Sequence, residues 1–304
     1  MMSYRNLILT LLTGILAACG TSSQPAPPPA AVPVAPTIEK PLRQPHIGIA
    51  LGGGAAKGFA HIGVLKVLES QGLTPEFVAG TSAGSVVGAL YASGLNGFAL
   101  QEKSFVLDEA NVRDLSIGGG GLVKGEKLQD YVNQLVGNRP IEKLSKPFAA
   151  VSTTLDTGER VVFRRGNTGQ AVRASCSIPG VFQPTIIAGK RYVDGGVVSP
   201  VPVDAARELG ADIVIAVDIS TKAQYGKTGD GMLSILNQTV IIMGQKLGEQ
   251  ELARADVIIR PQVNSIGAAD FEQKHNALLE GEKAAQAALP AIRAAIARWQ
   301  AEHR

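Results

Sequence analysis

The sequence is poor in cysteine and in aromatic residues, and both shortages exclude classes of protein. Only two cysteines, Cys19 and Cys176, occur in 304 residues, so there is neither a disulfide framework nor a CxxC metal-binding spacing. Aromatic residues make up 5% of the chain, and no basic run accompanies the formal net charge of +3. A nucleic-acid partner is therefore not expected. With 45% hydrophobic and 18% charged residues, the composition is that of a globular protein.

A hydrophobic run long enough to span a membrane is also missing near the N-terminus. Arg5 is followed by an apolar stretch that runs from Leu7 to Leu12 and continues through Gly14 and Ile15. A transmembrane helix needs about 20 apolar residues to cross a hydrocarbon core of about 30 Å. The charged start, the short apolar stretch and the small residues that end it instead predict a signal peptide over residues 1–18.

The end of this predicted signal peptide, Leu16-Ala17-Ala18-Cys19, closely resembles the lipobox of bacterial lipoproteins. The resemblance implies that cleavage leaves Cys19 as a first residue modified by lipid, palmitate included. More than one acyl chain would anchor the protein stably, since each buried CH₂ contributes about 0.8 kcal/mol. Gly20, by similarity to known lipoproteins, favours sorting to the outer membrane, facing the periplasm. An ordinary signal peptide with an incidental cysteine is the alternative.

Residues 19–44 are rich in proline, alanine and serine and predict a lipidated tether. Such a segment cannot bury enough apolar surface to fold. In polyproline geometry, at about 3.1 Å per residue, it would reach roughly 75 Å. The folded domain could then stand off the membrane or lie against it.

Residues 45–304 predict a single domain, because neither an internal repeat nor a second linker follows. Apolar runs predict strands at residues 47–51, 77–79, 148–151, 161–163, 213–217 and 257–259. Helical spacing predicts helices at residues 59–70, 83–92, 203–209 and 277–299. This alternation indicates a three-layer α/β/α domain with a largely parallel sheet. Residues 118–121 and 221–231 are expected to form surface loops, either beside the active site or merely solvated.

Gly80-Thr81-Ser82-Ala83-Gly84 lies between an expected strand and an expected helix, the context that a G-x-S-x-G nucleophile elbow requires. So tight a turn would strain the backbone of Ser82, while Gly80 and Gly84 let neighbouring segments approach. The helix that follows would point its positive end at a forming oxyanion. Ser82 is therefore a candidate nucleophile; a turn needed only for packing is the alternative.

A second glycine-rich segment, Gly52-Gly53-Gly54-Ala55-Ala56-Lys57-Gly58, joins the first expected strand to the first helix. No Walker A motif fits, and Lys57 stands where a dinucleotide fingerprint needs its third glycine. We expect an oxyanion hole, in which the backbone N–H groups near Gly53, Gly54 and Ala55 face a developing charge. Lys57 either orients this loop or is simply solvated.

A candidate base follows the strand-like residues 191–193. Asp194 is followed by Gly195 and Gly196, which would place a carboxylate on a turn at a strand end, although Asp-Gly is also a common turn. None of the four histidines is a strong candidate for the base, since two precede Ser82 and two lie in polar or terminal helical settings. These are His46, His61, His275 and His303.

The order of these three motifs resembles the patatin-like phospholipase family, including its bacterial branch related to neuropathy-target-esterase domains. Residues 121–125 and 174–184 resemble further blocks of the family, and the resemblance covers almost all of residues 47–289. It implies a Ser82–Asp194 dyad without histidine, lipid acyl ester substrates, and no metal or cofactor. Ala55 departs from the pattern, because the bacterial branch usually has a fourth glycine there. Cys176 is expected to be a small buried residue.

The function expected from this resemblance is that of a lipid-anchored serine lipid acyl hydrolase of the phospholipase A, lysophospholipase or esterase type. Membrane lipids would be both its substrate and its anchor. Because an exposed carboxylate is a weak base, with a pKa of about 3.9, Asp194 should be partly desolvated. Two alternatives remain: a non-catalytic lipid-binding lipoprotein of the envelope, and a Ser-His-Asp esterase or thioesterase that uses His275.

Overall fold

The computed structural model describes residues 43–105, 123–225 and 230–303. The predicted signal peptide, Cys19, nearly all of the predicted tether, and the expected loop at residues 118–121 lie outside these ranges. Within them, no helix combines the length and the apolar character that crossing a membrane requires.

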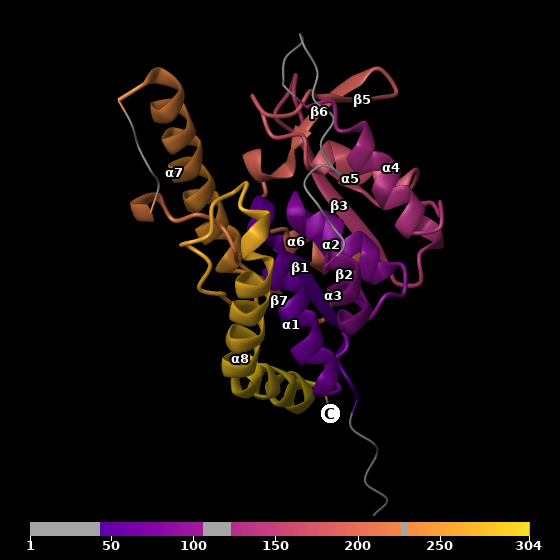
Figure 1. Cartoon of the computed structure of the whole chain (residues 1–304). Helices are drawn as coiled ribbons and strands as arrows, with labels where there is room; N and C mark the ends of the chain where they lie inside the picture. The colour runs from indigo at the N-terminus through magenta and orange to yellow at the C-terminus, as the bar shows by residue number, and fades with distance from the viewer. Residues whose placement is uncertain (1–42, 106–122, 226–229, 304) are drawn as a thin grey trace, which may run out of the picture. The chain divides into compact units, whose positions relative to one another are not determined.

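The described residues form one eight-stranded sheet with the path β5-β6-β3-β2-β1-β7-β8, and β4 pairs with β3 off this path (Figure 1). The parallel part consists of β3 (Phe148–Thr154), β2 (Phe77–Thr81), β1 (Ile47–Leu51), β7 (Ile213–Val217) and β8 (Val257–Ile259). The antiparallel strands are β4 (Arg160–Phe163), β5 (Thr185–Ile187) and β6 (Lys190–Asp194). The predicted α/β fold with a largely parallel sheet is confirmed.

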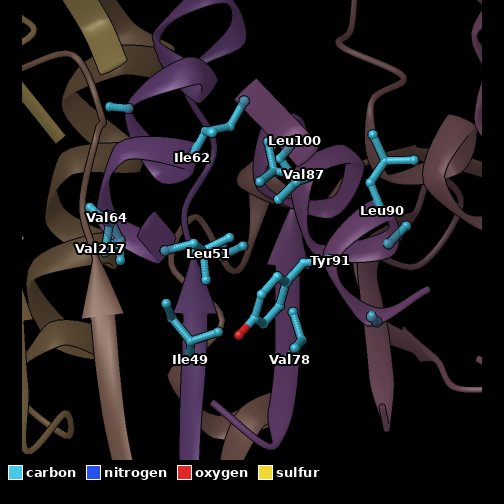
Figure 2. Close-up of a cluster of buried hydrophobic side chains, with 14 of the residues drawn as sticks. Ile49, Leu51, Ile62, Val64, Val78, Val87, Leu90, Tyr91, Leu100 and Val217 are labelled. Carbon is cyan, nitrogen blue, oxygen red and sulfur yellow. The ribbon is translucent and has the colours of Figure 1, made fainter. Parts of the chain in front are cut away.

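Alternation of large and small residues decides which face of the sheet each helix covers. In β1, Ile49 and Leu51 join the larger core cluster, whereas Ala50 joins a second cluster on the other face. Figure 2 shows Ile49 and Leu51 packed among side chains of the neighbouring strand and of the helices above it, Val78 and Tyr91 among them. Small residues on the second face let a helix approach closely.

The larger cluster is covered by α1 (Phe59–Ser70), α2 (Ala83–Ala92), α5 (Thr168–Ser175) and α8 (Lys274–Glu302). Buried residues of α3 (Gly97–Phe105) and α4 (Glu126–Leu135) join it. The second face is covered by α6 (Val203–Leu209) and by the last residue of α7 (Met232–Leu252). Because β1 and β2 pair in parallel, their carboxyl ends lie beside each other, where the two glycine-rich motifs begin.

Candidate active site

Ser82 occupies a strained turn between β2 and α2. Its backbone has φ 52° and ψ −126°, a conformation that non-glycine residues rarely adopt. A Cβ atom on Gly80 would lie 2.4 Å from the Gly84 carbonyl oxygen, and one on Gly84 would lie 2.0 Å from that of Leu51. Both glycines are therefore required by close backbone approach, and the predicted elbow geometry is confirmed. The role of Ser82 as nucleophile stays a prediction.

Two polar contacts fix the Ser82 turn from outside. The Ser82 N–H donates to Ser175 Oγ (2.9 Å), and the Ser175 hydroxyl in turn donates to the Val151 carbonyl (2.5 Å). On the preceding residue, Thr81 Oγ1 donates to the Ser199 carbonyl (2.8 Å). Ser175 had been noted only as part of a sequence block, because nothing in its neighbourhood along the chain links it to Ser82.

Asp194 ends β6 with its carboxyl group buried and held from one side. Oδ1 accepts the Gly196 N–H (2.7 Å), whereas Oδ2 has no hydrogen-bond partner within the part of the chain that the structure describes. The backbone is fixed by Thr153 Oγ1, which donates to the Asp194 carbonyl (2.9 Å). Gly195 cannot be replaced, because a Cβ atom there would lie 2.2 Å from the Val151 carbonyl oxygen.

Burial raises the pKa of Asp194 to about 6, although hydrogen bonding from the Ser82 hydroxyl and the Gly196 N–H lowers the pKa. The expected desolvation of this carboxylate is therefore confirmed. The Ser82 hydroxyl thus lies close enough to affect the carboxyl group, while Oδ2 lacks a fully formed hydrogen bond. Such long or poorly aligned contacts are common between catalytic groups when no substrate is bound.

The glycine loop packs directly against the Ser82 turn. A Cβ atom on Gly53 would lie 3.3 Å from that of Ser82, and one on Gly58 would lie 2.8 Å from that of Ala83. Gly52 N–H donates to the Val217 carbonyl (3.0 Å) and tethers the start of the loop to β7. The predicted closeness of the two motifs is confirmed.

Only part of the predicted oxyanion hole has free donors. Gly53 N–H already donates to the Pro200 carbonyl (3.0 Å), so this N–H is not free in the structure, and the oxyanion role expected for Gly53 stays a prediction. Among the described residues, the N–H groups of Gly54 and Ala55 have no acceptor. Ala55 itself has φ 51°, in the left-handed region that favours glycine, and it begins the short helix η1 (Ala55–Gly58).

Two buried titratable side chains, those of Lys57 and His61, hold the glycine loop in place. Lys57 is 2% exposed, and its Nζ donates to Thr221 Oγ1 (2.7 Å), so the alternative of a solvated lysine is wrong. Burial lowers the pKa of Lys57, against the effect of the nearby Asp218 carboxylate. His61 Nε2 donates to the Gly52 carbonyl (2.8 Å), and burial lowers the pKa of His61 to about 4. His61 is therefore a neutral support of the loop, a role that its sequence context did not indicate.

The remaining histidines have other surroundings. His46 Nδ1 contacts Glu76 at 2.8 Å, and His303 stacks on Trp299 near the end of α8. His275 is the second residue of α8. Within the described residues, no histidine lines the pocket that contains Ser82.

A cavity of about 330 Å³ opens beside Ser82 and is lined almost entirely by apolar side chains. They come from α1, α2, α3, α4, the segment after α5 and the segment before α8, and include Ile62, Val86, Leu90, Leu128, Phe182 and Phe271. Cys176 borders the same cavity. Burial raises the pKa of its thiol, so the thiol stays protonated, and the prediction of a small buried residue is confirmed.

The two further sequence blocks meet at one wall of this cavity. Val123 pairs with Phe182 in a parallel bridge, and Arg173 donates to the Lys124 carbonyl (2.7 Å).

In the described residues, no group of three His, Cys, Asp or Glu side chains could hold a metal ion.

The comparisons with known proteins agree with this geometry. The model of the patatin-like phospholipase family matches residues 49–207, more than half of the chain. The protein therefore belongs to the patatin-like phospholipase family.

Relatives within this family include two proteins of Mycobacterium tuberculosis described as uncharacterized NTE family proteins. One is 40% identical over 178 residues, 58% of this chain and 49% of the relative. The other is 31% identical over 271 residues, 81% of this chain and 46% of the relative. The chain thus spans about half the length of these relatives.

A lysophospholipase, NTE1 of Pyricularia oryzae, is 31% identical over 204 residues, 63% of this chain and 14% of the relative. Among solved structures, VipD from Legionella pneumophila matches with a TM-score of 0.57 and 14% identity, over 82% of this chain and 68% of that one. At this identity the likeness to VipD concerns the fold alone.

Proposed function

We propose that this chain is a serine lipid acyl hydrolase, a carboxylic ester hydrolase of the phospholipase A, lysophospholipase or esterase type, in which Ser82 and Asp194 form a catalytic dyad. The observation that carries the proposal is the pairing of a strained serine with a buried carboxylate at one end of an apolar cavity. Membership of the patatin-like phospholipase family and the likeness to a lysophospholipase support it.

In the proposed reaction, Asp194 accepts the Ser82 proton as Oγ attacks the ester carbonyl carbon. The tetrahedral oxyanion is stabilised by the N–H groups of Gly54 and Ala55 and by the amino-terminal end of α2. Asp194 then returns the proton to the departing alcohol oxygen, which leaves an acyl-enzyme. In the second step Asp194 deprotonates a water molecule, which attacks the acyl carbon, and the proton passes back to Ser82 as the fatty acid leaves.

The apolar cavity suits the acyl part of the substrate. Its lining offers almost no polar partner, and a charged or strongly polar group would be desolvated there without compensation. We therefore assign the cavity to the acyl chain and the solvent side of Ser82 to the leaving group.

Two variants separate this proposal from the alternatives. With a soluble short-chain ester as substrate, Ser82→Ala should abolish turnover and His275→Ala should leave it within a few-fold of the parent. A parent protein without turnover would favour a non-catalytic lipid-binding lipoprotein. A folded His275→Ala variant slowed by about three orders of magnitude would restore a triad, since a general base contributes about 10² to 10⁴ in rate.

The membrane anchor belongs to the same proposal and is supported by the sequence alone. Cys19 would carry the lipid, residues 19–44 would tether the domain of residues 45–304, and the protein would lie at the outer membrane, facing the periplasm.

A further inference from the structure

The amino-terminal part of α7 buries none of its described side chains, although Gln238 and Gln245 hydrogen-bond to Ala223 of the short helix η5 (Ala223–Tyr225). Within the helix, the buried residues are Gly248, Glu251 and Leu252, all in its last five positions. Among residues 232–247, no side chain that the structure describes is buried. At 1.5 Å per residue this part is about 24 Å long. Figure 1 shows it standing apart from the sheet, with its free end on the same side as β5 and β6.

This free part of α7 presents one apolar face. Five large apolar side chains, each between 52% and 74% exposed, recur at the three- and four-residue spacing of a single helical face. They are Met232, Ile235, Leu236, Val240 and Met243. We call them the α7 face. Residues 232–245 contain no Asp, Glu, Lys or Arg, and Ile242, which is 46% exposed, adds a further apolar side chain beside this face, so the surface carries no charge.

The fixed end of α7 lies beside the candidate active site. The helix packs against η4 (Gly195–Val197), which directly follows Asp194, and Val197 of this turn is itself 39% exposed. A partner that covers the α7 face would therefore approach the end of the sheet where Asp194 and Ser82 lie. An exposed apolar surface of this kind normally marks an interaction site.

We propose that the α7 face docks onto the surface of a lipid membrane and thereby brings the cavity beside Ser82 to its substrate, an inference that rests on the proposed function. The chain outside the structure supports this occupant, because a lipid at Cys19 and a tether of roughly 75 Å would keep the domain within reach of the bilayer. The lack of charge predicts attachment by apolar insertion, with little dependence on anionic lipid or on salt.

The test uses the full chain with Cys19→Ser, which removes the site of lipid attachment, and vesicles of phosphatidylcholine. The parent should co-sediment with these vesicles at low and at high salt. Replacing Ile235, Leu236 and Val240 together by Gln should lower the partition coefficient about tenfold or more, equal to about 1.4 kcal/mol. Leu279→Gln on α8, where Leu279 is 45% exposed, is the matched control and should bind like the parent.

Three results would overturn the proposal: vesicle binding retained by the triple variant, binding lost at high salt, or a parent dimer in sedimentation velocity that the triple variant converts to a monomer. The last result would assign the α7 face to a second copy of the chain. Circular dichroism checks that each variant is folded. Hydrolysis of a soluble ester by the parent tests the proposed function separately, because vesicle binding needs no turnover.

The buried end of α7 supports a second, independent inference. The Glu251 carboxylate is 5% exposed and accepts two hydrogen bonds, from Ser199 Oγ (2.5 Å) and from the Val201 N–H (2.8 Å). Burial raises the pKa of Glu251 to about 7, although both hydrogen bonds lower the pKa.

The segment that Glu251 holds, residues 199–201, touches all three candidate motifs. The Ser199 carbonyl accepts the Thr81 hydroxyl beside Ser82, and the Pro200 carbonyl accepts the Gly53 N–H of the glycine loop. The Ser199 N–H donates to the Gly195 carbonyl (2.8 Å), next to Asp194. One carboxylate on α7 therefore fixes the segment that joins the elbow, the loop and the aspartate turn.

We infer that Glu251 is a positioning residue for the Ser82–Asp194 pair. The test is Glu251→Gln, whose single acceptor oxygen can accept the Val201 N–H but leaves an NH₂ group facing Ser199 Oγ, so the Ser199 hydroxyl can no longer donate there and must accept instead. With a soluble ester, kcat should fall about tenfold or more while KM stays within about twofold, because small misplacements of reacting groups act on the rate. Labelling of Ser82 by a fluorophosphonate probe should slow in parallel.

Glu249→Gln is the matched control, since Glu249 lies on the same helix and, among the residues that the structure describes, its side chain hydrogen-bonds only to Gln245 and Lys246. It should match the parent in kcat and in labelling rate. The inference fails if Glu251→Gln labels at the parent rate, or if its loss of activity only tracks a loss of folded protein in thermal melting.

Discussion

Replacing Asp194 by Asn should make the protein inactive and more stable at the same time. Oδ1 of the new side chain can still accept the Gly196 N–H, so the turn should keep its geometry. What disappears is a carboxylate that burial holds at a pKa of about 6, against a reference value of 3.8. Since one pKa unit corresponds to about 1.4 kcal/mol, ionising this buried group costs the folded protein about 3 kcal/mol.

The gain in stability depends on pH in a defined direction. Below about pH 4 the carboxyl group is protonated in both folded and unfolded chains, so the parent and Asp194→Asn should be equally stable. As pH rises through about 4 to 6 the unfolded chain ionises first, which favours unfolding of the parent only. Above about pH 6 the variant should be more stable by about 3 kcal/mol, or about 6–12 °C in Tm for a domain of this size.

Urea unfolding at several pH values, followed by the fluorescence of Trp299, the single tryptophan of the chain, measures this difference. Ester hydrolysis by the same preparations should fall by a factor of about 10² to 10⁴. Asp156→Asn is the control, because Asp156 is exposed and its pKa is lowered by Arg191; it should bring no gain at neutral pH. A stability difference that is independent of pH, or a less stable Asp194→Asn variant, would refute the reasoning.

Three further outcomes are expected. A fluorophosphonate probe should label Ser82 alone, and mass spectrometry that finds the adduct on another serine would overturn the assignment of the elbow. Ala55→Gly should raise the free energy of unfolding by about 0.5–1 kcal/mol, because relief of the left-handed φ of Ala55 outweighs the greater chain entropy that glycine gives the unfolded state. Ala188→Gly, at a residue with φ 49°, should give a similar gain, and thermal melting measures both. Cys19→Ser combined with the triple replacement of Ile235, Leu236 and Val240 should release the protein from outer membranes in fractionation while ester hydrolysis persists; a combined variant that still sediments after high-salt washing would mean that neither the lipid nor the α7 face is the principal anchor.

Much of the fold could be predicted because its elements carry their own signals. The strand at Ile47–Leu51 and the helices at Phe59–Ser70 and Ala83–Ala92 begin and end where apolar spacing and glycines predicted. Helices α3, α4, α5 and α7 were not predicted. In α7, apolar residues do recur at helical spacing in the sequence, so this helix could have been predicted and was missed.

The sequence by itself determined the order of the glycine loop, the Ser82 elbow and the Asp194 turn, because each is a short pattern of neighbouring residues that can be recognised along the chain. Only the tertiary structure decided which groups surround them. The pairing of Gly53 N–H with Pro200, the contact of His61 with Gly52 and the support of residues 199–201 by Glu251 join segments far apart in the chain. The raised pKa of Asp194 likewise arises from burial, which depends on every packed neighbour and on no single motif.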